Sequence, residues 1–505
     1  MRMTSFPRNA GTLAFVIGAI LAAGCTPGPA YVRPSIDVPP QFKEQPAEGA
    51  DARHVRPGWV AAHPADAVDR ADWWSAFGDE TLDRLEARVD AGNPSIARQV
   101  ANLRAAKAEA GQASAAYYPT ITAGVDASRN HTSQNVVGRS LAGKTVSDYD
   151  AQVDVSWEPD LFDRIGHQVD AANARYQASA ADLASVSLAT HAELAVDYVG
   201  LRDADAEATL LEQTVADYTK ARDLVAVRFK GGIASDADLA QAETQLQVAR
   251  AQWVDVGESR AHFEHAIATL MGMPPSGLTI PASTTAIALP AVPAGLPSTL
   301  LERRPDIAAA ERRVAAANAD VGEATSAFFP DLLLSASGGL EASTLGSFAA
   351  LPSRFWSIGP ALVGTLFDGG RRKQALRQAE AKEDAAAADY RQTVLSAFQD
   401  VEDNLSSLRV LGNEATAQHR AVDAADRAAQ LALTRYQAGA TDYLEVVSTQ
   451  STALAQRRAD VELSRRQLES DIRLIKAIGG GWHADAAQTL ATQTATGALM
   501  AGYGS

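Results

Sequence analysis

The sequence predicts a mainly α-helical protein with a small β part, built from two tandem copies of one structural unit. Helical periodicity covers most of the chain, and three short motifs recur in the same order in its two halves. The motifs are an aromatic-aromatic-proline triplet at 117–119 and 328–330, the tripeptide LFD at 161–163 and 366–368, and the segments RFKGG at 228–232 and RYQAG at 435–439. The last pair lies 207 positions apart, which indicates a tandem duplication.

Composition narrows the class of protein. The chain has 505 residues, of which 46% are hydrophobic and only 6% aromatic, so alanine-rich, closely packed helices are expected. The net charge of −16 leaves no basic surface for a polyanion, and nucleic acid is therefore not an expected partner. A single cysteine excludes an internal disulfide framework and a cysteine-based zinc site.

The first 24 residues have the pattern of a secretory signal peptide. Arg2 and Arg8 precede an apolar run at 13–23, and the sequence LAAGC then ends at Cys25. This pattern resembles a bacterial lipobox and predicts lipidation of Cys25, although Ala22 stands where leucine is usual. The alternative is ordinary signal cleavage that leaves a free thiol.

The rest of the chain divides into an N-terminal strap, two repeats, a linker and a tail. The strap is rich in proline, which favours an extended chain. No stretch after the signal approaches the ~20 apolar residues that a membrane helix needs, so any membrane span would consist of strands. The expected segments are the strap at 25–71, the first repeat at 72–275, a proline-rich linker at 276–297, the second repeat at 298–481 and a flexible tail at 482–505.

Each repeat is expected to contain a pair of amphipathic strands. After Pro119 the hydrophobic period changes to two, with Ile121, Ala123 and Val125 on one face, which predicts a strand pair at about 119–158. A weaker pair is expected at about 330–366. Strands of about ten residues suit a bilayer crossing by tilted strands, but four strands cannot close a barrel. The sequence therefore predicts a barrel that several chains share.

A long helical hairpin is expected after each strand pair, at about 164–272 and 369–479. Asp163 and Asp368 of the LFD motifs are expected to cap the first helices. A 4,3 spacing of apolar residues, starting at Leu194 and at Val401, predicts coiled-coil packing of each hairpin. Each hairpin is expected to turn at the repeated arginine-aromatic-glycine motif, because glycine permits the left-handed backbone that ends a helix.

The order of these elements resembles the TolC-like family, the outer membrane channels of tripartite export systems. The block WWSAFGDETLDRLEARVDAGNPSI and the lipobox resemble its NodT and OprM-type lipoprotein branch, and the likeness runs from Cys25 to Trp482. It implies a homotrimer with a 12-stranded barrel in the outer membrane and an α-helical barrel across the periplasm. Thr26 after Cys25 implies sorting to the outer membrane by resemblance to bacterial lipoproteins. The implied partners are a periplasmic adaptor, an inner-membrane transporter and outer membrane lipid.

The candidate functional residues cluster at the hairpin tips. The resemblance places the pore constriction here, with Leu444 at an apolar gate position and Ser448 where aspartate is common. Asp238 and Glu445 occupy equivalent positions in the two repeats, and three copies of each would form rings of negative charge. The alternative is that both are ordinary exposed helix acids. The residues expected at the tips, where an adaptor would dock, are Arg228, Phe229, Gly232, Arg435, Tyr436 and Gly439.

The sequence does not predict an enzyme, a metal site or a cofactor. His262 and His265 are spaced to meet on a helix, but no third ligand is nearby, so solvated helix residues are the preferred interpretation. The segment LFDGGRRK lacks the spacing of a phosphate-binding loop and is interpreted as a turn with cations near lipid headgroups. A periplasmic coiled-coil scaffold or adaptor is the alternative function, since it would share the long hairpins but not the four strands.

Overall fold

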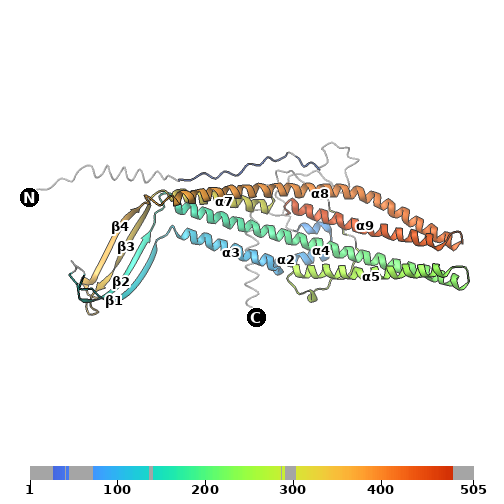
Figure 1. Ribbon diagram of the computed structural model, residues 1–505, viewed down its shortest axis with the longest axis horizontal. Coiled ribbons are helices and arrows are strands. Elements are labelled where there is room, and N and C mark those ends of the chain that lie inside the picture. The colour runs from blue at the N-terminus through green and yellow to red at the C-terminus, as the bar shows by residue number, and fades with distance from the viewer. Residues whose placement is uncertain are drawn as a thin grey trace, which may run out of the picture. The chain divides into compact units, whose positions relative to one another are not determined.

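The computed structural model describes residues 27–39, 41–44, 72–135, 140–285, 287–290 and 303–480. Their contacts divide the chain into two units (Figure 1). The first unit comprises Met1–Pro34, Arg104–Ala178 and Ala310–Tyr390, and the second comprises Ser35–Leu103, Ser179–Ala309 and Arg391–Ser505. The expected signal peptide at 1–24, Cys25 and the tail at 482–505 lie outside the described residues.

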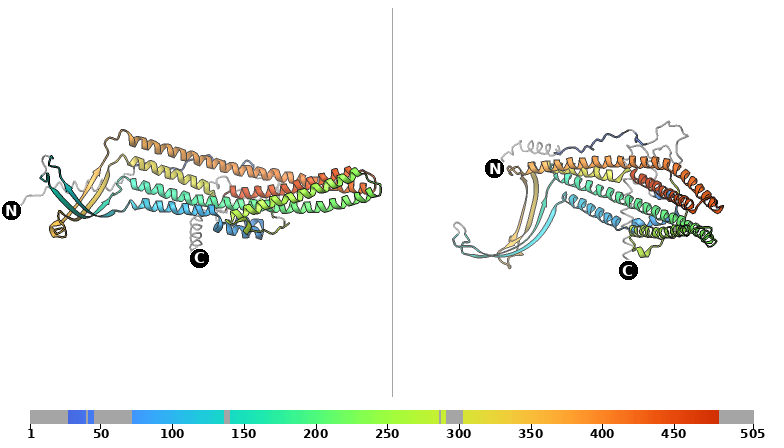
Figure 2. Two further views of the ribbon diagram at one scale, coloured as in Figure 1. Left: turned by 60° about the horizontal axis from the view of Figure 1, so that its bottom comes forward. Right: turned by 45° about the vertical axis from the view of Figure 1, so that its right-hand side comes forward.

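The first unit contains a single four-stranded antiparallel sheet among the described residues, with its strands in sequence order (Figures 1 and 2). In the pairs β1–β2 and β2–β3, residues of similar polarity mostly lie opposite each other, as Ile121 lies opposite Val155. The pair β3–β4 is less regular, since Asp331 lies opposite Val363. The alternation expected from the sequence therefore forms a continuous apolar face across the sheet. The strands are β1 (Thr120–His131), β2 (Thr145–Trp157), β3 (Asp331–Ala342) and β4 (Arg354–Val363), with the short helix η3 (Leu351–Ser353) before β4.

The helix α4 (Arg164–Lys230) follows β2, and α8 (Arg371–Gln437) follows β4. Asp368 caps α8 as expected, because its carboxylate accepts the amide protons of Gly370 at 2.9 Å and Arg372 at 3.2 Å. Asp163 does not cap α4, and that expectation is wrong. Asp163 has a positive φ of 57°, and the amide of Gly166 donates instead to Asp160 at 2.7 Å.

Two long helical hairpins are related by the repeat of 207 positions, and all but the first part of each outgoing helix belongs to the second unit (Figure 1). The outgoing helices α4 and α8 each have 67 residues, about 100 Å at the usual rise of about 1.5 Å per residue. They return as α5 (Asp236–Leu270) and α9 (Tyr443–Ala477) through turns in which Gly232 and Gly439 have φ values of 72° and 74°. The mainly helical fold with a small β part is confirmed. Among the described residues, no helix is both long and apolar enough to span a membrane.

The shorter helices also follow the repeat. α3 (Pro94–Ala115) and α7 (Pro305–Ser326) each have 22 residues and lie 211 positions apart. The second unit also has η1 (Trp73–Phe77) and α2 (Glu80–Gly92) before α3, and η2 (Pro275–Gly277) after α5. The predicted seam is buried along α4 and α8, with members such as Leu194, Leu211 and Leu405 fully enclosed. These apolar contacts hold the hairpins together.

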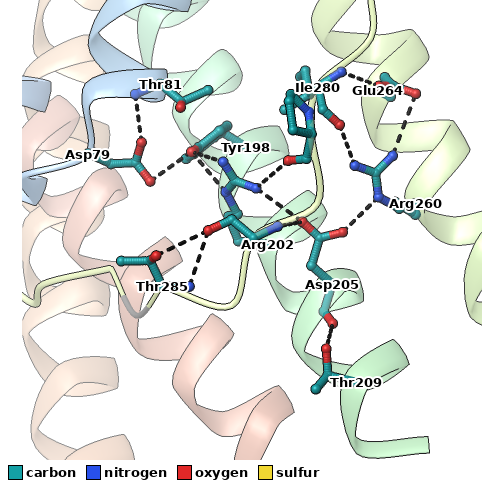
Figure 3. Close-up of polar contacts among 12 residues, drawn as sticks. Asp79, Thr81, Tyr198, Arg202, Asp205, Thr209, Arg260, Glu264, Ile280 and Thr285 are labelled. Atoms are coloured by element: carbon teal, nitrogen blue, oxygen red, sulfur yellow. Dashed lines mark hydrogen bonds and ion pairs between the residues drawn. The ribbon is translucent and has the colours of Figure 1, made fainter. Parts of the chain in front are cut away.

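A buried ionic network holds the linker between the repeats against the first hairpin (Figure 3). The carboxylate of Asp205 accepts from Arg260 at 2.7 Å, from Arg202 at 3.1 Å and from the backbone amide of Ser283 at 3.1 Å. Arg202 also donates to the carbonyl of Pro281 at 3.0 Å. Two arginines and a backbone amide compensate the loss of solvation that the buried Asp205 would otherwise suffer. The linker is therefore tied to α4 and α5.

The second repeat uses the equivalent arginine for a different segment. Arg409, 207 positions after Arg202, forms a 2.7 Å ion pair with Glu44 of the N-terminal strap. The backbone amides of Lys43 and Glu44 donate to Glu402 at 2.7 and 3.0 Å, and Phe42 is buried beside them. The strap therefore binds to this arginine of the second repeat, as the linker binds to the equivalent arginine of the first.

Candidate functional site

The tips of the two hairpins share one small hydrophobic core in the second unit. Tyr436 and Tyr443 pack edge to face in this core, with ring centroids 5.2 Å apart. Residues of all four long helices contribute to it, so the two hairpin tips are packed against each other. The buried members are Val225, Ala242, Ala432, Tyr436, Tyr443 and Val446.

Asp238 stabilises the start of the return helix α5. Its carboxylate accepts from the amide of Ser235 at 2.9 Å, and its own amide donates to the Ser235 hydroxyl at 3.1 Å. This reciprocal pair is a capping box, which satisfies two amide groups that the helix cannot bond internally. Asp238 is half-buried, and its carboxylate has a local structural role.

Glu445 occupies the equivalent position on α9 and has different partners. Its amide donates to the helix-capping carboxylate of Asp442 at 3.2 Å. Its own carboxylate accepts from Arg435 at 3.0 Å and from the hydroxyl of Thr441. The two acids that the sequence analysis proposed as charge rings are therefore both third residues of their helices. Each is held by groups of its own tip.

Arg228 joins the two hairpins at their tips. Its guanidinium donates to the carbonyls of Tyr436 at 2.7 Å and Gln437 at 2.5 Å, and it lies 4.7 Å from the centre of the Tyr436 ring. These carbonyls belong to the last turn of α8, where a cation is favoured. Arg435, the equivalent residue of the second repeat, instead pairs with Glu445 within its own hairpin. The two arginines occupy equivalent positions in the sequence but make different contacts.

The remaining predicted tip residues are mostly exposed. Leu444 and Ser448 lie one turn apart on α9, and the side chain of Leu444 is 57% exposed. Phe229 is 40% exposed, whereas the equivalent Tyr436 is buried. Leu444 and Phe229 therefore remain available for contacts outside this chain.

A groove of about 360 Å³ lies beside the tips, between α4, α8 and α9. Tyr218 lines the groove, and its hydroxyl donates to the carbonyl of Gln450 at 3.3 Å. The groove has both polar and apolar walls, a combination that suits a protein side chain better than a purely apolar ligand. Other lining residues are Lys220, Leu224, Leu433, Gln437 and Arg457.

Sequence reasoning missed the capping residues of both tips. Ser235 and Asp442 each stand three positions before the predicted acid, which is the spacing of an N-terminal capping pair. That spacing would have identified Asp238 and Glu445 as cap partners. No sequence signal distinguishes Arg228 from Arg435, because their different contacts depend on which hairpin lies beside each one.

Comparison with known proteins agrees with this arrangement of repeats, strands and hairpins. The family model described as "Outer membrane efflux protein" matches residues 87–273 and 296–480. These two matched segments correspond to the two repeats. The chain belongs to the outer membrane efflux protein family.

Several curated members of this family are similar over most of the chain. The pyoverdine export outer membrane protein OpmQ of Pseudomonas putida is 32% identical, over 85% of this chain and 92% of OpmQ. The toluene efflux pump outer membrane protein TtgF of Pseudomonas putida is 30% identical, over 94% of this chain and 98% of TtgF. OprJ of Pseudomonas aeruginosa is 29% identical, over 95% of this chain and 97% of OprJ.

Solved structures of outer membrane channels share the fold of this efflux protein. The channel OprN matches with a TM-score of 0.83 and 30% identity, and the match covers 91% of this chain and all of OprN. The open state of MtrE from Neisseria gonorrhoeae matches with a TM-score of 0.77 and 26% identity, over 91% of this chain and 99% of MtrE.

No metal site is apparent in the part of this efflux protein that the structure describes, where no group of three or more His, Cys, Asp or Glu side chains is placed to hold an ion. His262 lies 4.0 Å from Glu258 on an exposed helix face. A different histidine is buried. His191 stacks on Trp74 at 4.6 Å, and its ring nitrogens lie 2.7 Å from Glu86 and 3.2 Å from Asp90.

His191 and Glu86 in this cluster have raised pKa values, so both hold a proton more tightly than they would in the unfolded chain. Burial alone would lower the pKa of His191, but hydrogen bonds to Asp90 and Glu86 outweigh it and raise the pKa to about 9. Burial raises the pKa of Glu86 to about 7, despite the opposing effect of His191. The other groups acting on the cluster are Asp83, beside Glu86, and Ser187, beside Asp90.

We expect the second unit to lose stability as the pH rises from 6 to 9.5. Both raised pKa values act in this direction: the contribution of Glu86 is lost as the pH rises through about 7, and that of His191 through about 9. The pKa of Asp90 is lowered, so its contribution is lost only in acid, outside this range. The urea midpoint of tryptophan fluorescence, measured at several pH values, tests this expectation. His191→Gln should have a lower midpoint at pH 6 and a flatter pH profile, and an unchanged profile would contradict the assignment.

Proposed function

We propose that three copies of this chain form one channel of an efflux system in the outer membrane. The channel conducts small molecules passively from an inner-membrane transporter and a periplasmic adaptor to the exterior. The observation that carries this proposal is the four-stranded sheet, whose edge strands β1 and β4 have no partner on one side in the described chain. Such edges are not tolerated in lipid, and closure into a shared barrel of twelve strands removes them.

The long hairpins support the same assembly. In each chain α4 and α5 pair with α8 and α9 at the tips, so three chains supply six hairpins to an α-helical barrel. The names of OpmQ and TtgF identify export of pyoverdine and of toluene by those proteins. For this chain, selection of the cargo is assigned to the transporter and the adaptor, because the channel requires no chemistry of its own.

The periplasmic gate of this channel is placed near the hairpin tips. Leu444 is exposed there beside Ser448, and the ion pair of Arg435 with Glu445 fixes the turn that carries them. Arg228 fixes the first tip to the second. Opening would require the two tips to separate from those of the neighbouring chains. The exposed ring of Phe229 and the groove next to the tips are the surface proposed for the adaptor.

Purified protein should have the mass of three chains in detergent and should form ion-conducting channels in a planar bilayer. Closure of the sheet accounts for both results, because four strands cannot enclose a pore alone. Sodium carbonate should leave the protein in the membrane fraction of cells. A folded monomer, or release of the protein by carbonate, would contradict the channel and favour a peripheral scaffold.

Leu444→Ala should raise the resting conductance of single channels, because it removes an apolar side chain from the proposed constriction. Leu431→Ala is the matched control, since both leucines are 57% exposed and Leu431 lies away from the turn. The double variant Asp238→Asn and Glu445→Gln should reduce cation selectivity by removing both charge rings. If this variant forms normal trimers with unchanged selectivity, the two acids serve only in the local contacts of their own tips.

Cys25 is proposed to carry the lipid that adds a second anchor to the outer membrane. The sequence LAAGC at the end of the apolar run supports this proposal. Mass spectrometry of the mature N-terminus should show an acylated Cys25, and Cys25→Ser should abolish incorporation of labelled palmitate. An N-terminal mass without acyl chains in the unaltered protein would exclude lipidation. Channel activity should survive the substitution, because the strands hold the protein in the membrane.

A further inference from the structure

A second cavity lies between α4, α9 and the linker that joins the two repeats. It has a volume of about 300 Å³, and its described residues all belong to the second unit. Arg202 of α4 and Thr285 of the linker both line it (Figure 3). This volume and these mostly apolar walls are typical of a site for a small organic molecule. The apolar lining residues are Val199 and Ala206 on α4, Ile287 and Leu289 on the linker, and Val461 and Leu468 on α9.

Asp203 supplies a carboxylate to this cavity. Its side chain is only 15% exposed, and it forms an ion pair with Arg465 in which Nε lies 3.6 Å from the carboxylate. In the part of the chain that the structure describes, Asp203 accepts no hydrogen bond. A carboxylate that has lost most of its water normally regains hydrogen-bond donors from the protein. The carboxylate of Asp203 therefore has unused capacity to accept hydrogen bonds inside an apolar cavity.

The two arginines of the cavity already have acidic partners. Arg202 donates to Asp205 at 3.1 Å and to a linker carbonyl at 3.0 Å. Arg465 donates to Glu462 at 2.6 Å and to Glu469. Because both guanidinium groups are bonded to carboxylates, neither is available to an anionic ligand.

The charges around Asp203 leave one negative charge in excess. Glu207 accepts from Arg458 at 2.6 Å, and Glu469 accepts from Arg473 at 2.9 Å in addition to Arg465. The linker residues 283–289 carry no charged side chain. A cation in the cavity would therefore balance the group, in which four carboxylates share three guanidinium groups. The carboxylates are those of Asp203, Glu207, Glu462 and Glu469, and the guanidinium groups are those of Arg458, Arg465 and Arg473.

The helical hairpin does not itself require an acid at position 203. The residue 207 positions later is Val410 on α8, which is 48% exposed. The neighbouring Arg202 is retained in the second repeat as Arg409. Packing of the two hairpins therefore accounts for the shared arginine but not for Asp203, which stands where the cavity is formed.

We propose that this cavity binds an amphipathic organic cation, with its apolar body against Ile287 and Leu468 and its ammonium group at Asp203. Such a ligand supplies the hydrogen-bond donors and the positive charge that Asp203 lacks. Val461 lies about 25 Å beyond Leu444 along α9, so this site is separate from the proposed gate. A bound ligand would contact α4, α9 and the linker together, and would thus join the first hairpin to the second.

Two fluorescent probes test the preference for a cation. Dansyl-ethylenediamine carries a free ammonium group, and dansyl-ethanolamine carries a hydroxyl in its place. With the full-length protein in lipid nanodiscs, and with empty nanodiscs subtracted, the amine should bind about fivefold more tightly than the alcohol at pH 8, as expected for one partly exposed ion pair. Asp203→Asn should bind both probes as weakly as the unaltered protein binds the alcohol. Glu212→Gln, which removes an exposed acid of α4, is the matched control and should keep the preference.

The preference for the amine should mostly disappear at pH 6. Burial raises the pKa of Asp203 to about 7, an effect that Arg465 opposes and that Glu462, Glu207 and Glu469 reinforce. Asp203 is therefore mainly ionised at pH 8 and mainly neutral at pH 6, whereas the amine stays charged at both. Asp203→Asn should show no such dependence. A preference in the unaltered protein that is equal at both pH values would exclude Asp203 as the binding group.

The position of the site needs a separate test. Ser464→Trp places a large ring in the cavity and should weaken binding of both probes, while Ser464→Ala, which adds no bulk, should leave both unchanged. A photoreactive benzophenone alkylamine should label the unaltered protein within 199–206, 283–289 or 461–468, as read by mass spectrometry. Labelling confined to other segments, or equal binding of amine and alcohol by the unaltered protein at pH 8, would overturn the proposal whether or not the variants fold.

Discussion

The strand edge is the constraint on which this structure depends. A β-strand at the edge of a sheet exposes amide and carbonyl groups on one side, and lipid cannot bond them. The described residues form one sheet of four strands, with its edges at β1 and β4. In the channel proposed above, these edges pair with the edges of neighbouring copies.

The repeats share a backbone plan but differ at the contacts that matter for function. Arg228 joins the first tip to the second, while the equivalent Arg435 bonds Glu445 in its own hairpin. Arg202 holds the linker, while the equivalent Arg409 holds the strap. Equivalent positions in the two repeats therefore make different contacts within the chain.

Much of the fold could be predicted because its signals are local. The period of two after Pro119, the seam from Leu194 and the glycines at 232 and 439 act over a few residues, and all appear in the structure as expected. The prediction that Asp163 caps α4 was wrong. A second acid, Asp160, lies three positions earlier, and because the backbone at Asp163 is left-handed, Asp160 accepts the hydrogen bond from the amide of Gly166 instead. The 4,3 spacing that starts at Leu194 also includes Asp205, and nothing near Asp205 in sequence shows that Arg260 and the linker enclose it.

The sequence by itself determined the duplication, the helix and strand types and the turns, since these depend on spacing and on the backbone preferences of single residues. Only the tertiary structure decided the partners of Arg228, which are the carbonyls of Tyr436 and Gln437 in the other hairpin. The partners of Asp238, Glu445 and Arg435 lie within their own tips, close to them in sequence. Where a partner is distant in sequence, a side chain contacts whichever group the packing brings close to it. The same reason explains why Phe162 is stacked and Phe367 is exposed, although both stand in the same tripeptide.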